Sequence, residues 1–207
     1  DRPGGEDREK IGTELAEARG LTLIKPYDNA DVMAGQGTCG LEIAKQAAGL
    51  GVTQADVLVC CGGGGLTSGI AVALETAAPS LNARPVEPQH YDDVMRSLQS
   101  GERQFIDNPP PSICDAIVTP APGELTFPII NRLCKPGIAV TDEQALTAMG
   151  HALRRLKIVP EPGGSVALAA ALFHGEAIEG DTVICVVSGG NADDEMITRA
   201  LAASAIN

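Results

Sequence analysis

Four consecutive glycines form the stretch of this sequence that is best suited to chemistry. They follow a short apolar run at residues 57–61 and precede residues 66–75, where apolar side chains recur at helical spacing. Glycine has no Cβ, so such a turn lets the backbone approach a ligand closely, and the free N–H groups at the start of a helix attract an anion. The pattern predicts a phosphate site built from the backbone amides of Gly62, Gly63, Gly64, Gly65 and Leu66.

The residues that follow the glycines narrow the class of phosphate. A nucleotide P-loop needs a lysine and a hydroxyl residue directly after its glycines, whereas Leu66 and Thr67 stand there. A dinucleotide fingerprint fits only if the glycine register is shifted and Glu87 serves as its acidic residue. The spacing therefore favours a single phosphate monoester. A purely structural glycine turn and a dinucleotide-binding oxidoreductase stay open as alternatives.

Polar residues at the ends of other strand-like runs could complete such a site. Ser188 follows an apolar run at residues 182–187, and Glu87 follows the short run at residues 83–86. Ligands of open parallel sheets bind outside the carboxyl ends of the strands, so we expect both residues to converge with the glycine loop on one crevice. Ser188 could instead be a helix N-cap, and Glu161, which precedes a Pro-Gly-Gly turn, could be a structural turn residue.

Runs typical of strands and helices alternate along the whole chain. The sequence predicts strands at residues 21–24, 57–61, 83–86, 138–141 and 182–187. It predicts helices at residues 6–19, 39–48, 66–75, 92–99, 125–134, 141–156 and 165–173, with a last helix closing the chain. The alternation indicates a single α/β domain over residues 1–207, an open, mainly parallel twisted sheet with helices on both faces.

Two local patterns add detail to this fold. Thr141 and Gln144 match a capping box at the start of the helix predicted at residues 141–156. Residues 102–124 contain proline-rich segments and no regular apolar pattern. A loop of this length in a compact domain usually covers a functional site or forms an interface, so we expect one of these roles for it.

The composition argues against several classes of partner. The formal net charge is −12, whereas nucleic acids and anionic membrane surfaces attract basic proteins. No run of 18 apolar residues is present, so we expect no membrane-spanning segment. The six cysteines show no metal-binding spacing and three of them lie in apolar runs, which favours buried, reduced thiols and hence a cytoplasmic location.

Six short motifs, taken in order, resemble the threonine dehydratase/serine racemase group of fold-type II pyridoxal-phosphate (PLP) enzymes. They are Gly-Gln-Gly-Thr at residues 35–38, the glycine loop with Ser-Gly-Ile-Ala at 68–71, Val-Glu-Pro at 86–88, Ser-Leu at 97–98, Glu-Pro at 161–162 and Ser-Gly-Gly-Asn at 188–191. The motifs span nearly the whole chain with compatible spacing, so the set is specific although each motif alone is weak. The resemblance implies the large, PLP-binding domain of that fold.

The resemblance implies roles for particular residues. The amides of residues 62–66 would hold the cofactor phosphate, Ser188 would hydrogen-bond the pyridine nitrogen, and Glu161 would face the cofactor ring. A hydroxyl partner leaves the pyridine nitrogen largely unprotonated, which favours elimination over chemistry that needs a stronger electron sink.

The resemblance also implies a divalent-cation site. Glu87, Asp93 and the carbonyl of Tyr91 match such a site in part of the family, and their hard oxygen atoms suit Mg²⁺, Ca²⁺ or Mn²⁺. From spacing alone, an ordinary solvated acidic cluster at a helix N-terminus explains these residues equally well, because carboxylates are favoured there.

The chain departs from the family pattern at the most reactive residue. Family members form a Schiff base through a lysine in a Ser-Phe-Lys-like motif and carry a Ser-x-Gly-Asn-His-type loop in a small domain, and neither motif occurs here. The five lysines stand in other contexts, so no catalytic residue is assigned in this chain: Lys10, Lys25, Lys45, Lys135 and Lys157. We expect the lysine to come from a missing N-terminal segment or from another chain.

The resemblance implies a PLP-dependent ammonia-lyase of the dehydratase type. Such an enzyme removes water and ammonia from a β-hydroxy-amino acid, here serine, threonine or 3-hydroxyaspartate, and gives a 2-oxo acid. It would act as a homodimer, and this chain alone, without its lysine, would be inactive. Two alternatives stay open: an amino-acid racemase of the same family, and a lysine-less module that holds PLP or another phosphate noncovalently without catalysis.

Overall fold

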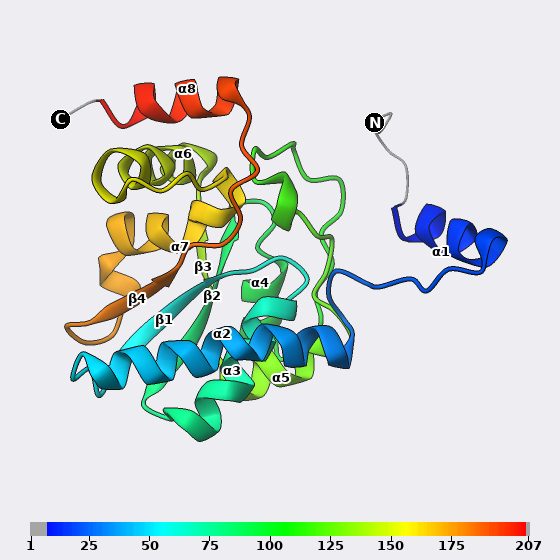
Figure 1. Cartoon of the computed structure of the whole chain (residues 1–207), viewed down its shortest axis with the longest axis horizontal. Coiled ribbons are helices and arrows are strands. Elements are labelled where there is room, and N and C mark those ends of the chain that lie inside the picture. The colour runs from blue at the N-terminus through cyan, green and yellow to red at the C-terminus, as the bar shows by residue number, and fades with distance from the viewer. Residues whose placement is uncertain (1–7, 206–207) are drawn as a thin grey trace.

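A four-stranded sheet forms the centre of the protein (Figure 1). The computed structural model describes residues 8–205. The strands are β1 (Ala55–Cys60), β2 (Leu81–Pro88), β3 (Ile138–Val140) and β4 (Val183–Val186); their order is β3-β2-β1-β4, and every pairing is parallel. All residues of β1 are buried, as expected for a central parallel strand. The predicted α/β fold with a parallel sheet is confirmed.

Helices cover both faces of this sheet. α2 (Ala30–Gly49) and α3 (Gly65–Ala77) pack on the face that carries Val57 and Val59, whereas α6 (Asp142–His151) and α7 (Pro162–Phe173) pack on the face that carries Leu58. Successive strand residues point to opposite faces, so the apolar residues 57–60 of β1 join both cores. The other helices are α1 (Arg8–Arg19), α4 (Asp93–Ser100), α5 (Thr126–Leu133) and α8 (Asp194–Ala203), with short helical turns at Asp115–Ile117, Ala152–Leu156 and Gly175–Ala177.

The N-terminal part of the described chain projects away from the sheet (Figure 1). The helix predicted at residues 6–19 is confirmed from Arg8 onward, and residues 6 and 7 lie outside the described residues. The strand predicted at residues 21–24 is wrong: this segment has no regular structure, and Leu21 and Ile24 are 59% and 78% exposed. A strand needs a hydrogen-bonded neighbour, and within residues 8–205 no other strand pairs with it.

α2 begins well before the predicted helix at residues 39–48. The side chain of Asn29 accepts hydrogen bonds from the N–H groups of Asp31 and Val32 and so caps the helix at its actual start. Gly40 inside α2 reflects the close packing of this helix on α3, since a Cβ there would lie 2.8 Å from the Ile70 carbonyl oxygen, whereas Gly35 and Gly49 have open space around them. A tertiary contact, and not a turn, explains Gly40.

The C-terminal helices follow the sequence prediction with one change. The predicted capping box of Thr141 and Gln144 is confirmed, with both hydrogen bonds present at 3.1 and 2.9 Å. The helix that it opens ends at His151, and Ala152–Leu156 continues as a π-helical turn. α8 packs against α6 on the side away from the sheet. Across residues 8–205, every helix falls short of the length and apolarity that crossing a membrane requires.

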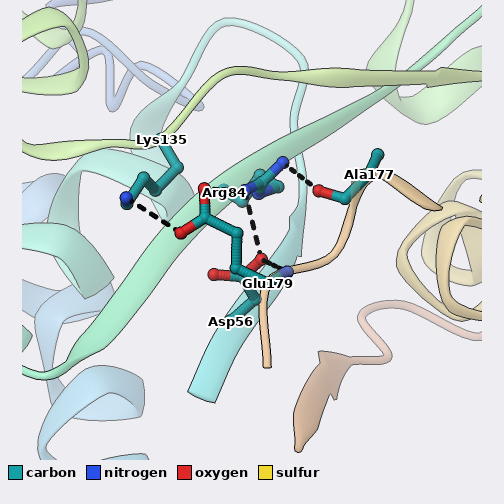
Figure 2. A network of polar contacts seen from close by, with 5 residues as sticks. All are labelled: Asp56, Arg84, Lys135, Ala177 and Glu179. Atoms are coloured by element: carbon teal, nitrogen blue, oxygen red, sulfur yellow. Dashed lines mark hydrogen bonds and ion pairs between the residues drawn. The ribbon is translucent and has the colours of Figure 1, made fainter. Parts of the chain in front are cut away.

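A buried ion pair ties the segment before β4 to the middle of the sheet (Figure 2). The Arg84 guanidinium of β2 lies 3.1 Å from Asp56 Oδ2 of β1, and both side chains are almost fully buried. Arg84 also donates to the Ala177 carbonyl at 2.6 Å, and the Glu179 N–H donates to Asp56 Oδ2 at 2.9 Å. At the surface, Lys135 pairs with Glu179 at 3.1 Å. These contacts hold the chain that leads into β4 against β1 and β2.

Candidate functional site

A cavity of about 750 Å³ opens at the carboxyl ends of β1 and β4. β1 and β4 are parallel neighbours, with Val59 paired to Val186, so the loops that follow them leave the sheet at the same edge. Residues 62–66, after β1, and Ser188, after β4, both line the cavity. The structure therefore brings together two of the loops that the strand-end argument predicts to converge. A volume of this size is typical of small-molecule sites.

The glycine loop presents backbone atoms to the cavity. Gly64 has a φ of +94°, in the left-handed region that glycine adopts readily, and α3 begins at the next residue. A Cβ on Gly64 would lie 2.6 Å from Ile130 Cδ1, and one on Gly63 would clash with the Tyr27 ring. The first N–H groups of α3 lack intrahelical partners, and the helix dipole adds positive charge there. The loop thus has the shape and polarity that a phosphate group requires.

Contacts between the loop after β4 and the start of α7 fix Ser188. Its N–H donates to the Gly164 carbonyl at 3.2 Å, and a Cβ on Gly164 would clash with the Ser188 carbonyl. Glu161, the N-cap residue of α7, accepts a hydrogen bond from the Asn191 N–H at 3.1 Å and donates its own N–H to the Gly189 carbonyl at 3.2 Å. Glu161 therefore orders the Ser188 loop from behind and is not among the described residues that line the cavity.

Two further segments complete the cavity wall. The middle of the loop at residues 102–124, from Ala116 to Pro120, lines the cavity, in agreement with the expectation that this loop covers a functional site. The second segment comes from the N-terminal part of the chain and was not expected from any sequence pattern, since only the tertiary fold brings it there: Thr13, Leu23, Lys25, Pro26 and Tyr27. Lys25 thereby adds a primary amine to the wall.

The thiols at the base of the cavity are uncharged. Burial raises the pKa of Cys60, and hydrogen bonds from Ala167 and Ser188 offset this only in part. Burial and the neighbouring Glu87 carboxylate raise the pKa of Cys61 well above its ordinary value. All six cysteines are free thiols, three of them buried and three half-buried. A protonated thiol is a poor nucleophile, so Cys60 and Cys61 contribute shape rather than reactivity to the site.

Glu87 does not join the cavity, so the expected convergence of three loops is wrong for this residue. Its side chain is fully buried on the α4 side of the sheet, opposite to its neighbour Val86, because residues alternate along a strand. Its two carboxylate oxygens accept hydrogen bonds from the N–H groups of Val94 and Met95 at 2.8 and 2.7 Å. Glu87 therefore caps the first turn of α4.

Asp93 lies beside Glu87 at the start of α4. It is 1% exposed, and neither of its carboxylate oxygens has a hydrogen-bond partner among the described residues. Burial raises the pKa of Asp93 to about 7, and burial together with the Asp93 charge raises the pKa of Glu87 well above its ordinary value. No group of three or more His, Cys, Asp or Glu side chains within residues 8–205 is arranged to hold a metal ion. Any cation here would need oxygen ligands from the backbone as well.

Comparison with known proteins identifies relatives of the whole arrangement. A family model described as "Pyridoxal-phosphate dependent enzyme" matches residues 3–189. An L-threo-3-hydroxyaspartate ammonia-lyase of Saccharomyces cerevisiae is 40% identical over 189 residues, which are 91% of this chain and 56% of that protein. A serine racemase of Schizosaccharomyces pombe is 37% identical over 190 residues, which are 92% of this chain and 57% of that protein.

A solved structure supports the same relationship. A threonine deaminase from T.th. superposes with a TM-score of 0.85 at 40% identity, covering 90% of this chain and 63% of that one. The chain thus spans somewhat more than half the length of the curated relatives that it matches. Since the family model covers most of the chain, including the glycine loop and Ser188, the chain belongs to the family of pyridoxal-phosphate dependent enzymes.

Proposed function

We propose that this chain is the large, cofactor-binding domain of a PLP-dependent ammonia-lyase. The enzyme would remove water and ammonia from a β-hydroxy-amino acid such as serine, threonine or 3-hydroxyaspartate and give a 2-oxo acid. The observation that carries the proposal is the cavity at the ends of β1 and β4, in which a backbone phosphate cradle and Ser188 face the same space. The relatives named as ammonia-lyases support the reaction class.

Each residue of the site has a defined task in this proposal. The amides of residues 62–66 bind the phosphate, and the Ser188 hydroxyl meets the pyridine nitrogen. Glu161 acts through the loop that it orders, because its carboxylate holds the Asn191 N–H behind Ser188. PLP, when bound, supplies an electron sink for the charge that develops at the substrate α-carbon. A neutral hydroxyl, unlike a carboxylate, leaves the pyridine nitrogen largely unprotonated. The cofactor then withdraws electrons less strongly, which favours elimination.

The catalytic lysine would come from further protein that covers the N-terminal part of this chain. An apolar surface on α1 and the segment after it supports this, since its side chains are exposed within the described chain: Ile11, Leu15, Leu21, Leu23 and Ile24. Isolated proteins rarely expose so many clustered apolar residues without a partner. The greater length of the relatives is consistent with such a covering segment. The complete enzyme would be a homodimer in the cytoplasm, where its six free thiols stay reduced.

The acidic cluster at the start of α4 would hold a divalent cation. Asp93 offers two buried oxygens without hydrogen-bond partners among the described residues, and Glu87 is adjacent. The Tyr91 carbonyl would complete the set. A cation there would neutralise two carboxylates that burial otherwise destabilises. Hard oxygen ligands suit Mg²⁺, Ca²⁺ or Mn²⁺.

A racemase is the second candidate. It is favoured by the serine racemase relative at 37% identity, and it shares the removal of the substrate α-proton with the lyase reaction. A racemase needs a second proton donor on the opposite face of the substrate, so product analysis separates the two. The complete gene product would be incubated with L-serine, L-threonine and L-threo-3-hydroxyaspartate, and 2-oxo acid and D-amino acid would both be measured. A D-amino acid without 2-oxo acid would overturn the lyase proposal.

Cofactor binding can be tested on this chain directly. PLP is titrated onto the purified chain by equilibrium dialysis, and we expect saturable binding that inorganic phosphate competes away. The Gly64→Ala variant should lose binding because a Cβ there meets Ile130 and the φ is +94°. Gly101→Ala is the matched control, since Gly101 also has a positive φ of +77° but open space around it, outside the cavity. Binding that Gly64→Ala leaves unchanged would contradict the proposed cradle.

A further inference from the structure

The side of the glycine loop that faces away from the cavity is held by the start of α5. The Thr126 hydroxyl donates a hydrogen bond to the Gly63 carbonyl oxygen at 2.6 Å, and the Gly123 N–H donates to the same oxygen at 3.1 Å. Thr126 is fully buried, so water does not compete for its hydroxyl. The Gly63 carbonyl is therefore clamped by two donors.

The clamp fixes the direction of the next N–H group. In a trans peptide the C=O and the following N–H point in opposite directions, so a Gly63 carbonyl turned towards α5 turns the Gly64 N–H away from α5. Gly63 and Gly64 line the cavity, whereas Thr126 and Gly123 are not among the described residues that do. The Gly64 N–H consequently points to the cavity side of the loop.

The loop needs such a clamp because its sequence does not define one backbone conformation. A peptide between two glycines can rotate through both signs of φ at low cost. The reversed peptide would present a carbonyl oxygen, with its partial negative charge, to an anion in the cavity. The four glycines allow the close approach of a ligand, but they leave the orientation of this peptide to an outside contact.

The start of α5 is itself held in place, so the Thr126 hydroxyl has a fixed position relative to the glycine loop. Asp28, which has a φ of +56°, accepts hydrogen bonds through Oδ1 from the N–H groups of Leu125 at 2.7 Å and Thr126 at 3.4 Å. The next residue, Asn29, caps α2. The starts of α2, α3 and α5 thus meet at one point, and the glycine loop is the element with the weakest conformational preference among them.

We propose that Thr126 is a positioning residue for the phosphate site: with the Gly123 N–H it orients the Gly63–Gly64 peptide so that the Gly64 N–H donates to the bound phosphate. This inference rests on the proposed function for its ligand, but the orientation of the peptide is a property of the free chain. Thr126 lies outside the motifs that define the family resemblance.

The test compares four forms of the whole ¹⁵N-labelled chain: the wild type and three variants. Thr126→Val keeps the shape and removes the hydroxyl, Thr126→Ser keeps the hydroxyl, and Thr198→Val removes a hydroxyl that bonds the Asp194 carbonyl within α8. The probes are inorganic phosphate and PLP, added separately. We expect Thr126→Val to weaken binding of both probes roughly tenfold, the loss of about one hydrogen bond, while Thr126→Ser and Thr198→Val bind like the wild type.

A second measurement, made by NMR, tests this inference independently of the proposed function. In the ligand-free chain, the ¹⁵N shift of Gly64 reports the hydrogen bonds on the Gly63 carbonyl, since both atoms belong to one peptide. We expect Thr126→Val alone to move this signal. If the wild type binds neither probe yet the Gly64 signal moves in this way, the proposed function fails and the orienting contact stands. A Gly64 signal unchanged in Thr126→Val, or equal affinity for phosphate in Thr126→Val and the wild type, overturns the inference.

Discussion

Replacing Arg84 by methionine tests how strongly the buried ion pair holds the sheet together. Methionine keeps most of the side-chain volume but removes the donor to Asp56 at 3.1 Å and the donor to the Ala177 carbonyl at 2.6 Å. Asp56 is 0% exposed, and its Oδ1 already lacks a partner among the described residues. The carboxylate would be left buried with only the Glu179 N–H as a partner. Breaking a buried pair in this way costs about 3–5 kcal/mol of the free energy of unfolding.

The measurement is urea-induced unfolding followed by circular dichroism, at one pH and one salt concentration. The matched control is Arg132→Met, which removes an exposed arginine that makes two hydrogen bonds to the exposed Glu75. Water replaces that partner at once, so the control should unfold close to the wild-type midpoint. Both arginines pair with a carboxylate, so the difference in free energy of unfolding between the two variants reports the effect of burial.

The double variant Asp56→Leu/Arg84→Met shows whether the unpaired, buried Asp56 carboxylate causes the loss of stability in Arg84→Met. It removes both charges and leaves apolar side chains in the core, so it should regain much of the stability lost in Arg84→Met. The reasoning is refuted if Arg84→Met unfolds within about 1 kcal/mol of the wild type, which is the ordinary range for a hydrogen bond. It is also refuted if the double variant is no more stable than the single one, since packing would then be the cause.

Three other predictions concern the two sites. Burial raises the pKa of Asp93 from 3.8 to about 7, so the folded chain binds this proton more tightly than the unfolded chain. Without divalent cations, ionisation of Asp93 should lower the free energy of unfolding in urea by up to about 4 kcal/mol between about pH 4 and pH 7. Asp93→Asn should remove this contribution and leave the one from Glu87, whose pKa is raised by its own burial. Adding Mg²⁺, Ca²⁺ or Mn²⁺ at about 100 times its dissociation constant should raise the free energy of unfolding of the wild type at pH 7 by about 2.7 kcal/mol. The same gain is expected in the control Asp31→Asn but not in Asp93→Asn. A thermal midpoint of the wild type that the cation leaves unchanged would argue against a cation site. Gly164→Ala should weaken PLP binding in equilibrium dialysis, because its Cβ displaces the Ser188 carbonyl. The control Gly163→Ala should bind PLP normally, since its Cβ would lie 3.3 Å from the nearest atom. Equal affinities of the two variants for PLP would mean that the Ser188 loop does not contribute to binding.

The parts of the fold that local sequence determines were predicted correctly. Residues 57–60 of β1 form an apolar run with β-branched residues, α3 has regular apolar spacing, and the capping box of Thr141 is a local contact, so each can be recognised without knowledge of the rest of the chain. The position of the glycine loop follows from the order of β1 and α3. The meeting of this loop with Ser188 follows from the parallel pairing of β1 with β4.

The parts that depend on tertiary contacts could not be predicted in this way. The glycines at residues 35 and 37 resemble a turn in the sequence, yet both lie inside α2; Gly37 approaches α3, where a Cβ would lie 3.2 Å from the Gly69 carbonyl oxygen, whereas Gly35 has open space around it. The segment at residues 21–24 has strand composition, but a strand forms only where a neighbour is present. The direction of Glu87 depends on strand register, and the approach of Lys25 to the cavity depends on the path of the whole N-terminal segment.

The position of β4 at the edge of the sheet has a consequence for how this chain behaves in solution. Its four residues are apolar and only partly buried, and within the described chain its one hydrogen-bonded neighbour is β1. The free edge presents a row of backbone donors and acceptors beside apolar side chains, and it carries neither proline nor charge within the strand. Such an edge recruits strands from other molecules, so the isolated chain should self-associate in a concentration-dependent manner through intermolecular strand addition.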